Sequence, residues 1–197
     1  RCPHANYVVQ KCINFMSPSM SQFIIDEIME DDDLIALSKH KFGCRVVQRL
    51  LEMCPAEQVH DLVELLLAGF LLISTHAYGN FVVQCLLQNI ADKQRTRLVD
   101  LVEQHLPELA LRANGCAVIC AALEHGDTMD RGILAEMVLE DGDRIAFMVD
   151  SRYGDAIIIN LLDVLEDAGY HRLLALLEGN PKFEAVLQQR SYRGTCA

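Results

Sequence analysis

The chain has 197 residues, is 51% hydrophobic and contains 11 glycines and 5 prolines, which suits one globular or repeat-built domain with an ample core. Its longest apolar run, from Leu65 to Ile73, has nine residues. A membrane span needs about 20, so a membrane protein is excluded. The formal net charge is −11, from 17 basic and 28 acidic residues, and such a balance is unfavourable for binding phosphates over the whole chain.

The charge is unevenly distributed along the chain. Residues 1–54 carry six basic and seven acidic side chains, whereas residues 55–197 carry 11 basic and 21 acidic ones. Lys39, Lys41, Arg45 and Arg49 lie close together in the near-neutral first part. We therefore expect any contact with a polyanion there, and we expect the acidic remainder to face away from it.

The eight cysteines do not indicate a disulfide framework, because the chain is long and its apolar residues recur at helical spacing. Cys12, Cys54 and Cys85 stand among aliphatic residues, which predicts buried, reduced thiols in a cytosolic protein. Cys116 and Cys120, four residues apart, could touch one metal ion. No second pair stands at ligand spacing, so neither a metal nor another cofactor is predicted.

A six-residue motif recurs along the chain at steps of 38, 36, 36, 39 and 40 residues. A fixed period in this range is typical of a stacked repeat protein. Three copies are closely similar, two are weaker, and the last is cut off by the end of the chain. The copies are Ala5-Asn6-Tyr7-Val8-Val9-Gln10, Gly43-Cys44-Arg45-Val46-Val47-Gln48, Gly79-Asn80-Phe81-Val82-Val83-Gln84, Gly115-Cys116-Ala117-Val118-Ile119-Cys120, Gly154-Asp155-Ala156-Ile157-Ile158-Ile159 and Gly194-Thr195-Cys196-Ala197.

In chain order, residues 1–16 are predicted to form the second half of a first repeat, and Ser17-Pro18-Ser19 indicates the start of a further helix. Glu30-Asp31-Asp32-Asp33 is expected to be a solvated turn. Each later repeat has a short apolar piece, a polar link, the motif helix and a third helix, and almost nothing alternates with period two, so an all-α chain is expected. The short pieces are Leu34–Ser38, Leu71–Thr75, Leu109–Arg112, Ile145–Val149 and Phe183–Leu187.

The repeats are expected to form a single domain, because each unit is too small to bury its apolar face alone. After the partial repeat 1–16, the predicted units are about 17–54, 55–90, 91–126 and 127–168, followed by a truncated unit, 169–197.

The chain starts just before one motif helix and ends just inside another. This predicts that it is a fragment of a longer array.

The motif places polar and planar side chains on one face of a helix. Asn80 and Gln84 are four residues apart, and Phe81 and Gln84 are three apart, so all three share a face while the paired valines point to the core. Two amides can hydrogen-bond the edge of a base while a planar side chain stacks on it. The planar residue varies as Tyr7, Arg45 and Phe81.

His40 and His76 each stand three residues before a motif glycine, which invites a catalytic interpretation. No nucleophile or acid–base partner recurs beside them, and no P-loop, dinucleotide or His-Glu-x-x-His motif is present. We therefore predict that these histidines hydrogen-bond the start of the adjacent helix, and that the chain is not an enzyme.

The segment His40-Lys41-Phe42-Gly43-Cys44-Arg45-Val46-Val47-Gln48-Arg49-Leu50-Leu51-Glu52 resembles the adenine-reading helix of the Pumilio (PUF) family. The resemblance implies an α-solenoid of stacked three-helix repeats forming a curved superhelix. It further implies a monomeric protein that binds single-stranded RNA, one base per repeat. By this resemblance the target is an mRNA, the role is post-transcriptional regulation and the location is cytoplasmic, with a nucleolar or nuclear location as the alternative.

Carried over residue by residue, the resemblance implies an RNA core of 5′-U-A-U-3′, which reads the same in either direction. The first and third units would each hold a uracil, and the second would hold an adenine. The implied contacts are Asn6 and Gln10 with Tyr7 stacking, Cys44 and Gln48 with Arg45 stacking, and Asn80 and Gln84 with Phe81 stacking.

The chain also departs from the family pattern. Ala5 replaces a motif glycine, and no unit carries the Ser and Glu pair that the family uses for guanine. The alternative hypothesis is therefore a protein-binding solenoid with a decayed RNA code, for example in RNA processing or ribosome assembly, with its partner on the acidic second half. The decayed positions are Cys116, Ala117 and Cys120 in the fourth unit, and Asp155, Ala156 and Ile159 in the fifth.

Overall fold

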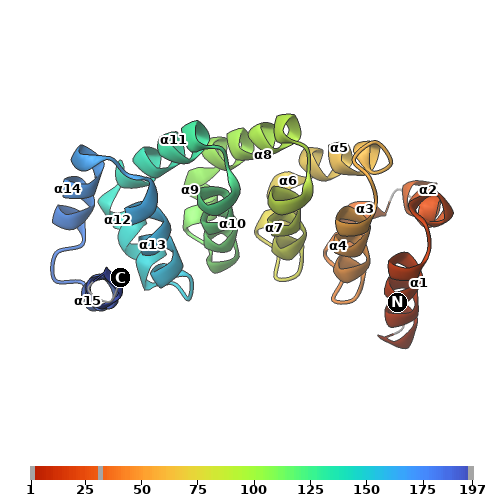
Figure 1. Ribbon diagram of the computed structural model, residues 1–197, viewed down its shortest axis with the longest axis horizontal. Helices are drawn as coiled ribbons and strands as arrows, with labels where there is room; N and C mark the ends of the chain where they lie inside the picture. The colour runs from red at the N-terminus through yellow and green to blue at the C-terminus, as the bar shows by residue number, and fades with distance from the viewer. Residues whose placement is uncertain (1–2, 31–32, 195–197) are drawn as a thin grey trace. The chain divides into compact units, whose positions relative to one another are not determined.

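The computed structural model describes residues 3–30 and 33–194, and every regular element in these residues is a helix (Figure 1). The all-α prediction is therefore confirmed. The chain forms two compact units, Arg1–Leu101 and Val102–Ala197, which are described separately below.

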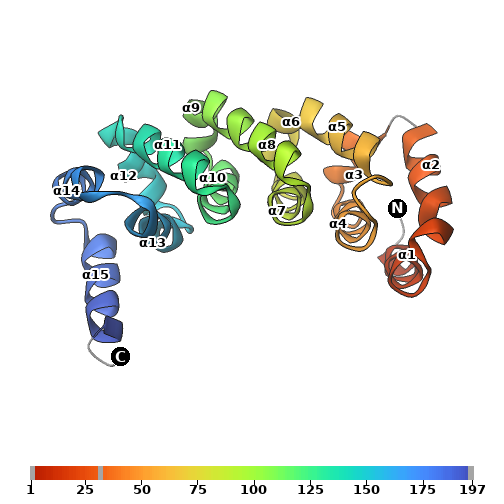
Figure 2. The ribbon, with the colours of Figure 1, turned by 45° about the horizontal axis from the view of Figure 1, so that its top comes forward.

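In the first unit the motif helices α1, α4 and α7 pack side by side, α1 against α4 and α4 against α7 (Figures 1 and 2). Short helices precede α4 and α7, and longer helices follow each motif helix. The elements are α1 (Pro3–Phe15), a 3-10 helix (Pro18–Ser21), α2 (Gln22–Glu30), α3 (Leu34–Ser38), α4 (Gly43–Met53), α5 (His60–Ala68), α6 (Phe70–Ser74), α7 (Gly79–Asn89) and α8 (Asp92–Gln104), whose last three residues belong to the second unit.

The second unit continues the same order of short, motif and third helices. Its motif helices α10 and α13 pack together, and α13 also packs against α15. The elements are α9 (Leu106–Ala110), α10 (Ala113–His125), α11 (Thr128–Leu139), α12 (Gly142–Asp150), α13 (Gly154–Val164), α14 (Asp167–Leu176) and α15 (Pro181–Gly194).

The short helices follow the sequence prediction unevenly. The piece Leu34–Ser38 is confirmed as α3, whereas α9 starts three residues before the predicted Leu109. The predicted piece Phe183–Leu187 is wrong as a separate helix, because α15 runs through it to Gly194 without a break. No glycine, proline or capping histidine interrupts the intervening residues, so nothing stops the helix. Residues 195–197 of the last motif, like Asp31 and Asp32 of the acidic turn, lie outside the described residues.

The paired apolar residues of the motif helices point to the core. Val46, Val47, Val82 and Val83 are all buried, as predicted. The pair in α1 differs, because Val8 is 58% exposed and Val9 is only half-buried.

The motif glycines are required by a close approach between helices. A Cβ atom on Gly79 would lie 2.5 Å from the carbonyl oxygen of Ile73 in α6, and one on Gly115 would lie 2.1 Å from that of Leu109 in α9. Neither glycine has a positive φ, so the requirement is steric. Ala5, at the same motif position in α1, instead lines an open pocket of about 410 Å³. The methyl group of Ala5 is therefore tolerated where a Cβ on Gly79 would not be.

The cysteines in the core are neutral thiols. Cys54 and Cys85 are buried, as predicted, whereas Cys12 is only half-buried. Burial raises the pKa of the Cys54 thiol. Burial, together with the nearby Glu52 carboxylate, raises the pKa of Cys85 to about 12.

Two glycine substitutions should separate steric contact from helix propensity. Gly79→Ala should lower the free energy of unfolding by about 1–3 kcal/mol, because the new methyl group overlaps the α6 backbone. Gly132→Ala, in the middle of α11, should raise it by about 0.5–1 kcal/mol, because a Cβ there meets nothing within 4 Å. Urea unfolding followed by circular dichroism measures both. Equal effects of the two substitutions would contradict the steric argument.

Candidate nucleic-acid interface

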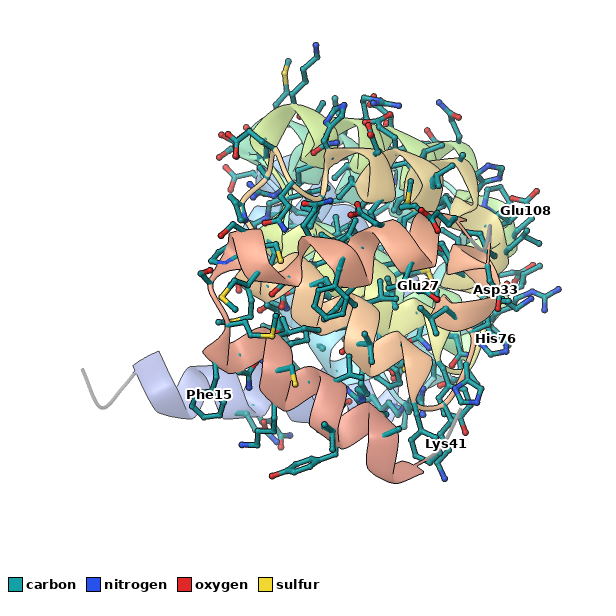
Figure 3. The ribbon with its side chains drawn as sticks, turned by 90° about the vertical axis from the view of Figure 1, so that its right-hand side faces the viewer. Phe15, Glu27, Asp33, Lys41, His76 and Glu108 are labelled. Atoms are coloured by element: carbon teal, nitrogen blue, oxygen red, sulfur yellow. The ribbon has the colours of Figure 1, made fainter. Side chains whose placement is uncertain are left out.

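The link histidines hydrogen-bond the starts of two motif helices. The Nδ1 atom of His40 accepts from the backbone N–H of Gly43 at 3.1 Å, and Nδ1 of His76 accepts from that of Gly79 at 3.4 Å. The prediction that these residues hydrogen-bond the start of the adjacent helix is confirmed. Figure 3 shows Lys41 and His76 along the same edge of the first unit, away from Phe15.

A related contact in the fifth repeat was missed by the sequence analysis. Ser151 also stands three residues before its motif glycine, Gly154, and its Oγ accepts from the backbone N–H of Tyr153 at 3.2 Å. The constant offset from the glycine was the signal that could have identified it.

In α7 the amide pair is ordered by its own link. Asn80 is fully buried, and its Nδ2 donates to the backbone oxygens of His76 and Ala77, at 2.8 and 3.0 Å. Its Oδ1 accepts from Nε2 of Gln84 at 2.9 Å. Asn80 therefore fixes the orientation of Gln84, and the half-buried Gln84 is the amide presented on the surface of α7.

In α1 the same arrangement recurs between Asn6 and Gln10, whose Nε2 donates to Oδ1 of Asn6. Tyr7 is 62% exposed beside this pair. The Nζ atom of Lys11 lies 5.5 Å from the centroid of the Tyr7 ring, so a cation accompanies the planar side chain.

In α4 the glutamine is held differently. Cys44 is buried, and its thiol, whose pKa is raised by burial, donates to the backbone oxygen of Lys41. Nη1 of Arg45 donates to Oε1 of Gln48 at 3.2 Å, and Nε2 of Gln48 is buried without a hydrogen-bond partner. A buried unpaired donor is costly, so Nε2 of Gln48 is a group that a ligand acceptor would satisfy.

The planar side chains of neighbouring motif helices lie together. The guanidinium carbon of Arg45 in α4 is 5.4 Å from the centroid of the Phe81 ring in α7. Phe81 is three residues before the half-buried Gln84 on α7, and Arg45 is three residues before the half-buried Gln48 on α4. A glutamine amide supplies an acceptor oxygen and an NH₂ group with two N–H donors, which matches the edge of a uracil or an adenine.

The corresponding positions in the second unit lack these features. Cys116, Ala117 and Cys120 of α10 are buried, and Nδ2 of Asn160 donates to the Cys120 backbone oxygen at 3.1 Å. Asp155, Ala156 and Ile159 of α13 are exposed but form no amide pair.

Within residues 3–30 and 33–194, no group of three or more His, Cys, Asp or Glu side chains is placed to hold a metal ion. In the same residues, no helix has both the length and the apolar character needed to cross a membrane.

A second repeated contact was also missed from the sequence. The guanidinium of Arg95 in α8 donates to the backbone oxygens of Leu87 and Ile90, and Arg131 in α11 donates to that of Leu123. These arginines bind the C-terminal carbonyls of the preceding motif helix, where positive charge is favourable. Arg95 and Arg131 are one repeat apart, and that spacing was the available signal.

The architecture and the repeated motif define an array of helical repeats in which α1, α4 and α7 carry glutamine amides and planar side chains. Residues 2–29, 33–67 and 69–102 match the Pumilio-family RNA-binding repeat. The chain belongs to the Pumilio family, which is a family of binding proteins and not of enzymes.

Several relatives illustrate the similarity. The chain is 48% identical over 56 residues to the suppressor protein MPT5 of Saccharomyces cerevisiae, covering 28% of this chain and 6% of that protein. It is 26% identical over 180 residues to the putative pumilio homolog 8, chloroplastic, of Arabidopsis thaliana, covering 90% of this chain and 34% of that protein. The chain thus spans no more than about a third of these relatives.

Two solved structures share the fold over 95% of this chain. A structure of PUF-8 in complex with PBE-RNA superposes with a TM-score of 0.79 at 25% identity, and 58% of that chain is covered. The Puf3 RNA-binding domain bound to a Cox17 RNA 3′ UTR site superposes with a TM-score of 0.81 at 23% identity, and 55% of that chain is covered. The predicted Pumilio-type repeat fold is therefore confirmed.

Acid should weaken the start of α7 through His76. Burial lowers the pKa of His76, with the neighbouring Lys39 charge as a second cause, and the neutral ring is needed for Nδ1 to accept. Because the folded-state pKa lies below the ordinary value of about 6.5, the stabilisation is complete above that pH and is lost as the pH falls through the lower value.

The variant His76→Asn keeps a side-chain acceptor but cannot titrate. Urea unfolding from about pH 7.5 to about pH 5 should show the wild-type free energy of unfolding falling relative to that of the variant. Parallel pH profiles for the two proteins would contradict this role for His76.

Proposed function

We propose that the chain binds single-stranded RNA of an mRNA along α1, α4 and α7 and acts in post-transcriptional regulation. The observation that carries the proposal is the repeated pairing of one glutamine amide with one planar side chain three residues before it on the same helix. Gln84 lies beside Phe81, Gln10 beside Tyr7, and Gln48 beside Arg45. The solved relatives bound to PBE-RNA and to a Cox17 3′ UTR site support it.

The proposed base contacts follow from how each glutamine is held. With Nε2 of Gln84 donating to Asn80, the Gln84 Oε1 can accept from N3–H of uracil while the second N–H donates to a uracil oxygen. Gln10 repeats this arrangement. Nε2 of Gln48 is buried and unpaired, so the Gln48 amide would turn outward to donate to a ring nitrogen of adenine, with Oε1 next to Arg45. The proposed core is 5′-U-A-U-3′.

The affinity of this stretch is expected to be modest. Three stacked bases contribute about 3–9 kcal/mol. Association costs about 4–15 kcal/mol. Lys39, Lys41 and Arg45 add attraction for phosphates on the near-neutral part of the chain, so binding should weaken as salt increases.

A second function concerns the acidic half. The buried Cys116 and Cys120 and the exposed Asp155 and Ile159 offer neither an amide pair nor a planar group, and an aspartate repels phosphate. We propose that this half contributes little to RNA affinity and binds a protein partner.

Gln48→Ala should remove the preference for the central adenine, because it deletes the only proposed adenine donor. The expected loss is about 1–3 kcal/mol of discrimination between U-A-U and U-C-U oligonucleotides, because the adenine acceptor is left without a partner. Fluorescence anisotropy with both oligonucleotides measures it. Gln104→Ala, at an exposed glutamine of α8, is the matched control and should change neither affinity. A uniform loss of affinity for both RNAs would reject base reading by Gln48.

Recoding α7 should change its base preference from U to G. Gln84→Glu alone places a carboxylate against Oδ1 of Asn80, two acceptors facing each other, so it should lose uracil and gain little. Adding Asn80→Ser supplies a hydroxyl that can donate to the new carboxylate, which then accepts from N1–H and N2–H of guanine. The double variant should therefore prefer G over U at that base in anisotropy titrations. An unchanged preference for U would mean that Gln84 does not face the RNA.

A further inference from the structure

A groove of about 630 Å³ lies in the second unit between α11 and α14. Met129, Gly132 and Ile133 of α11 line one side, and Leu165 and Gly169 line the other. The C-terminal end of motif helix α13 also lines the groove, at Val164, whereas the motif positions at the start of α13, Asp155 to Ile159, do not.

The walls of the groove expose apolar surface that the fold does not use. The side chain of Met129 is 75% exposed and that of Ile133 is 47% exposed. Gly132 lies inside α11, where glycine is unfavourable, yet a Cβ at this position would meet nothing within 4 Å. Packing therefore does not require a glycine at position 132. The missing side chain of Gly132 leaves the groove open between Met129 and Ile133.

The rim of the groove is acidic. Glu136 and Glu140 of α11 and Glu166 before α14 line it, and residues 127–169 contain 11 carboxylates against three arginines. Arg172 lies 3.4 Å from Glu136, but both side chains are about half exposed, so the pair is weak. The carboxylates leave the rim with a negative field.

None of the three arginines of this segment lines the groove, and each is engaged in another contact. Arg131 donates to the Leu123 backbone oxygen, and Arg144 donates to that of Met137. Arg152 lies over the Tyr153 ring.

We propose that the groove between α11 and α14 binds an amphipathic helix of a partner protein, with aliphatic side chains on one face and lysine or arginine at its edges. The aliphatic face fits the exposed Met129 and Ile133, and the basic edges fit Glu136, Glu140 and Glu166. Anchors spaced three or four residues apart are the usual way in which a helix occupies such a groove. The described residues contain no strand edge to which an extended peptide could add. The negative rim repels RNA.

The probe is a fluorescein-labelled peptide of about 16 residues, a helix of about 24 Å, with leucines on one face and lysines on the other. It should bind the intact chain near physiological ionic strength, measured by anisotropy. Gly132→Leu fills the groove from a position without steric conflict and should weaken binding at least about tenfold. Gly132→Ala also removes the glycine but adds only a methyl group, so it should change the peptide affinity by less than about twofold.

Met129→Gln, at a largely exposed site, should weaken peptide binding with the fold intact.

Replacing the peptide lysines with glutamine should remove most of the affinity. Adding a U-A-U oligonucleotide should not displace the peptide, and Gly132→Leu should leave RNA affinity unchanged. This separates the proposal from the RNA-binding function, which can fail on its own. Equal binding to Gly132→Leu, Gly132→Ala and wild type would place the peptide elsewhere on the acidic surface and overturn the proposal. Absence of binding to the wild type, or displacement by RNA, would overturn it as well.

Discussion

The contact on which each repeat depends is the approach of a short helix to the first residue of the next motif helix. At Gly79, Gly115 and Gly154 a Cβ would lie 2.5, 2.1 and 1.7 Å from a backbone oxygen of the preceding short helix. The link between the two helices is therefore compressed into a tight turn. A link residue such as His76 can then reach the first N–H groups of the motif helix. The glycine and the link residue act together, since one permits the approach and the other satisfies the helix start that the approach creates.

This compact link also determines which atoms of the motif reach the surface. Because the link carbonyls of His76 and Ala77 lie beside Asn80, its amide hydrogens are used internally, and Asn80 orients Gln84. Asn80 thus acts through Gln84 in this conformation, whereas the buried Cys44 donates its thiol to the Lys41 backbone oxygen. The proposed code then depends on how each glutamine is held: by an asparagine below it in α1 and α7, and by Arg45 in α4.

The period of the glycines and the paired valines was enough to predict the helical repeats, because close helix contacts allow only glycine and buried helix faces favour apolar residues. Which of the two amides faces outward could not be predicted, since it depends on the position of the link carbonyls beside Asn80. The sequence analysis predicted a short piece at Phe183 by analogy with the other units. It missed the continuous α15 because the residues after Leu187 contain nothing that ends a helix before Gly194. The spacing of Arg95 and Arg131 indicated a repeated role. Their acceptors could not be predicted, because every residue has a backbone oxygen and the residue type does not show which one is contacted.

The buried thiols have a consequence for how the array can be observed. Cys85 of α7 contacts the Gln48 backbone oxygen of α4, and Cys120 of α10 contacts Asn160 of α13, so each thiol sits at a junction between adjacent motif helices. Burial, with Glu52 for Cys85 and Glu124 for Cys120, raises the two pKa values to about 12 and about 11. At neutral pH the reactive thiolate is then on the order of one part in 10⁴ to 10⁵, so alkylation requires the junction to separate first. The alkylation rate of each of these two cysteines therefore reports how often its own pair of motif helices separates, without any cysteine having to be introduced.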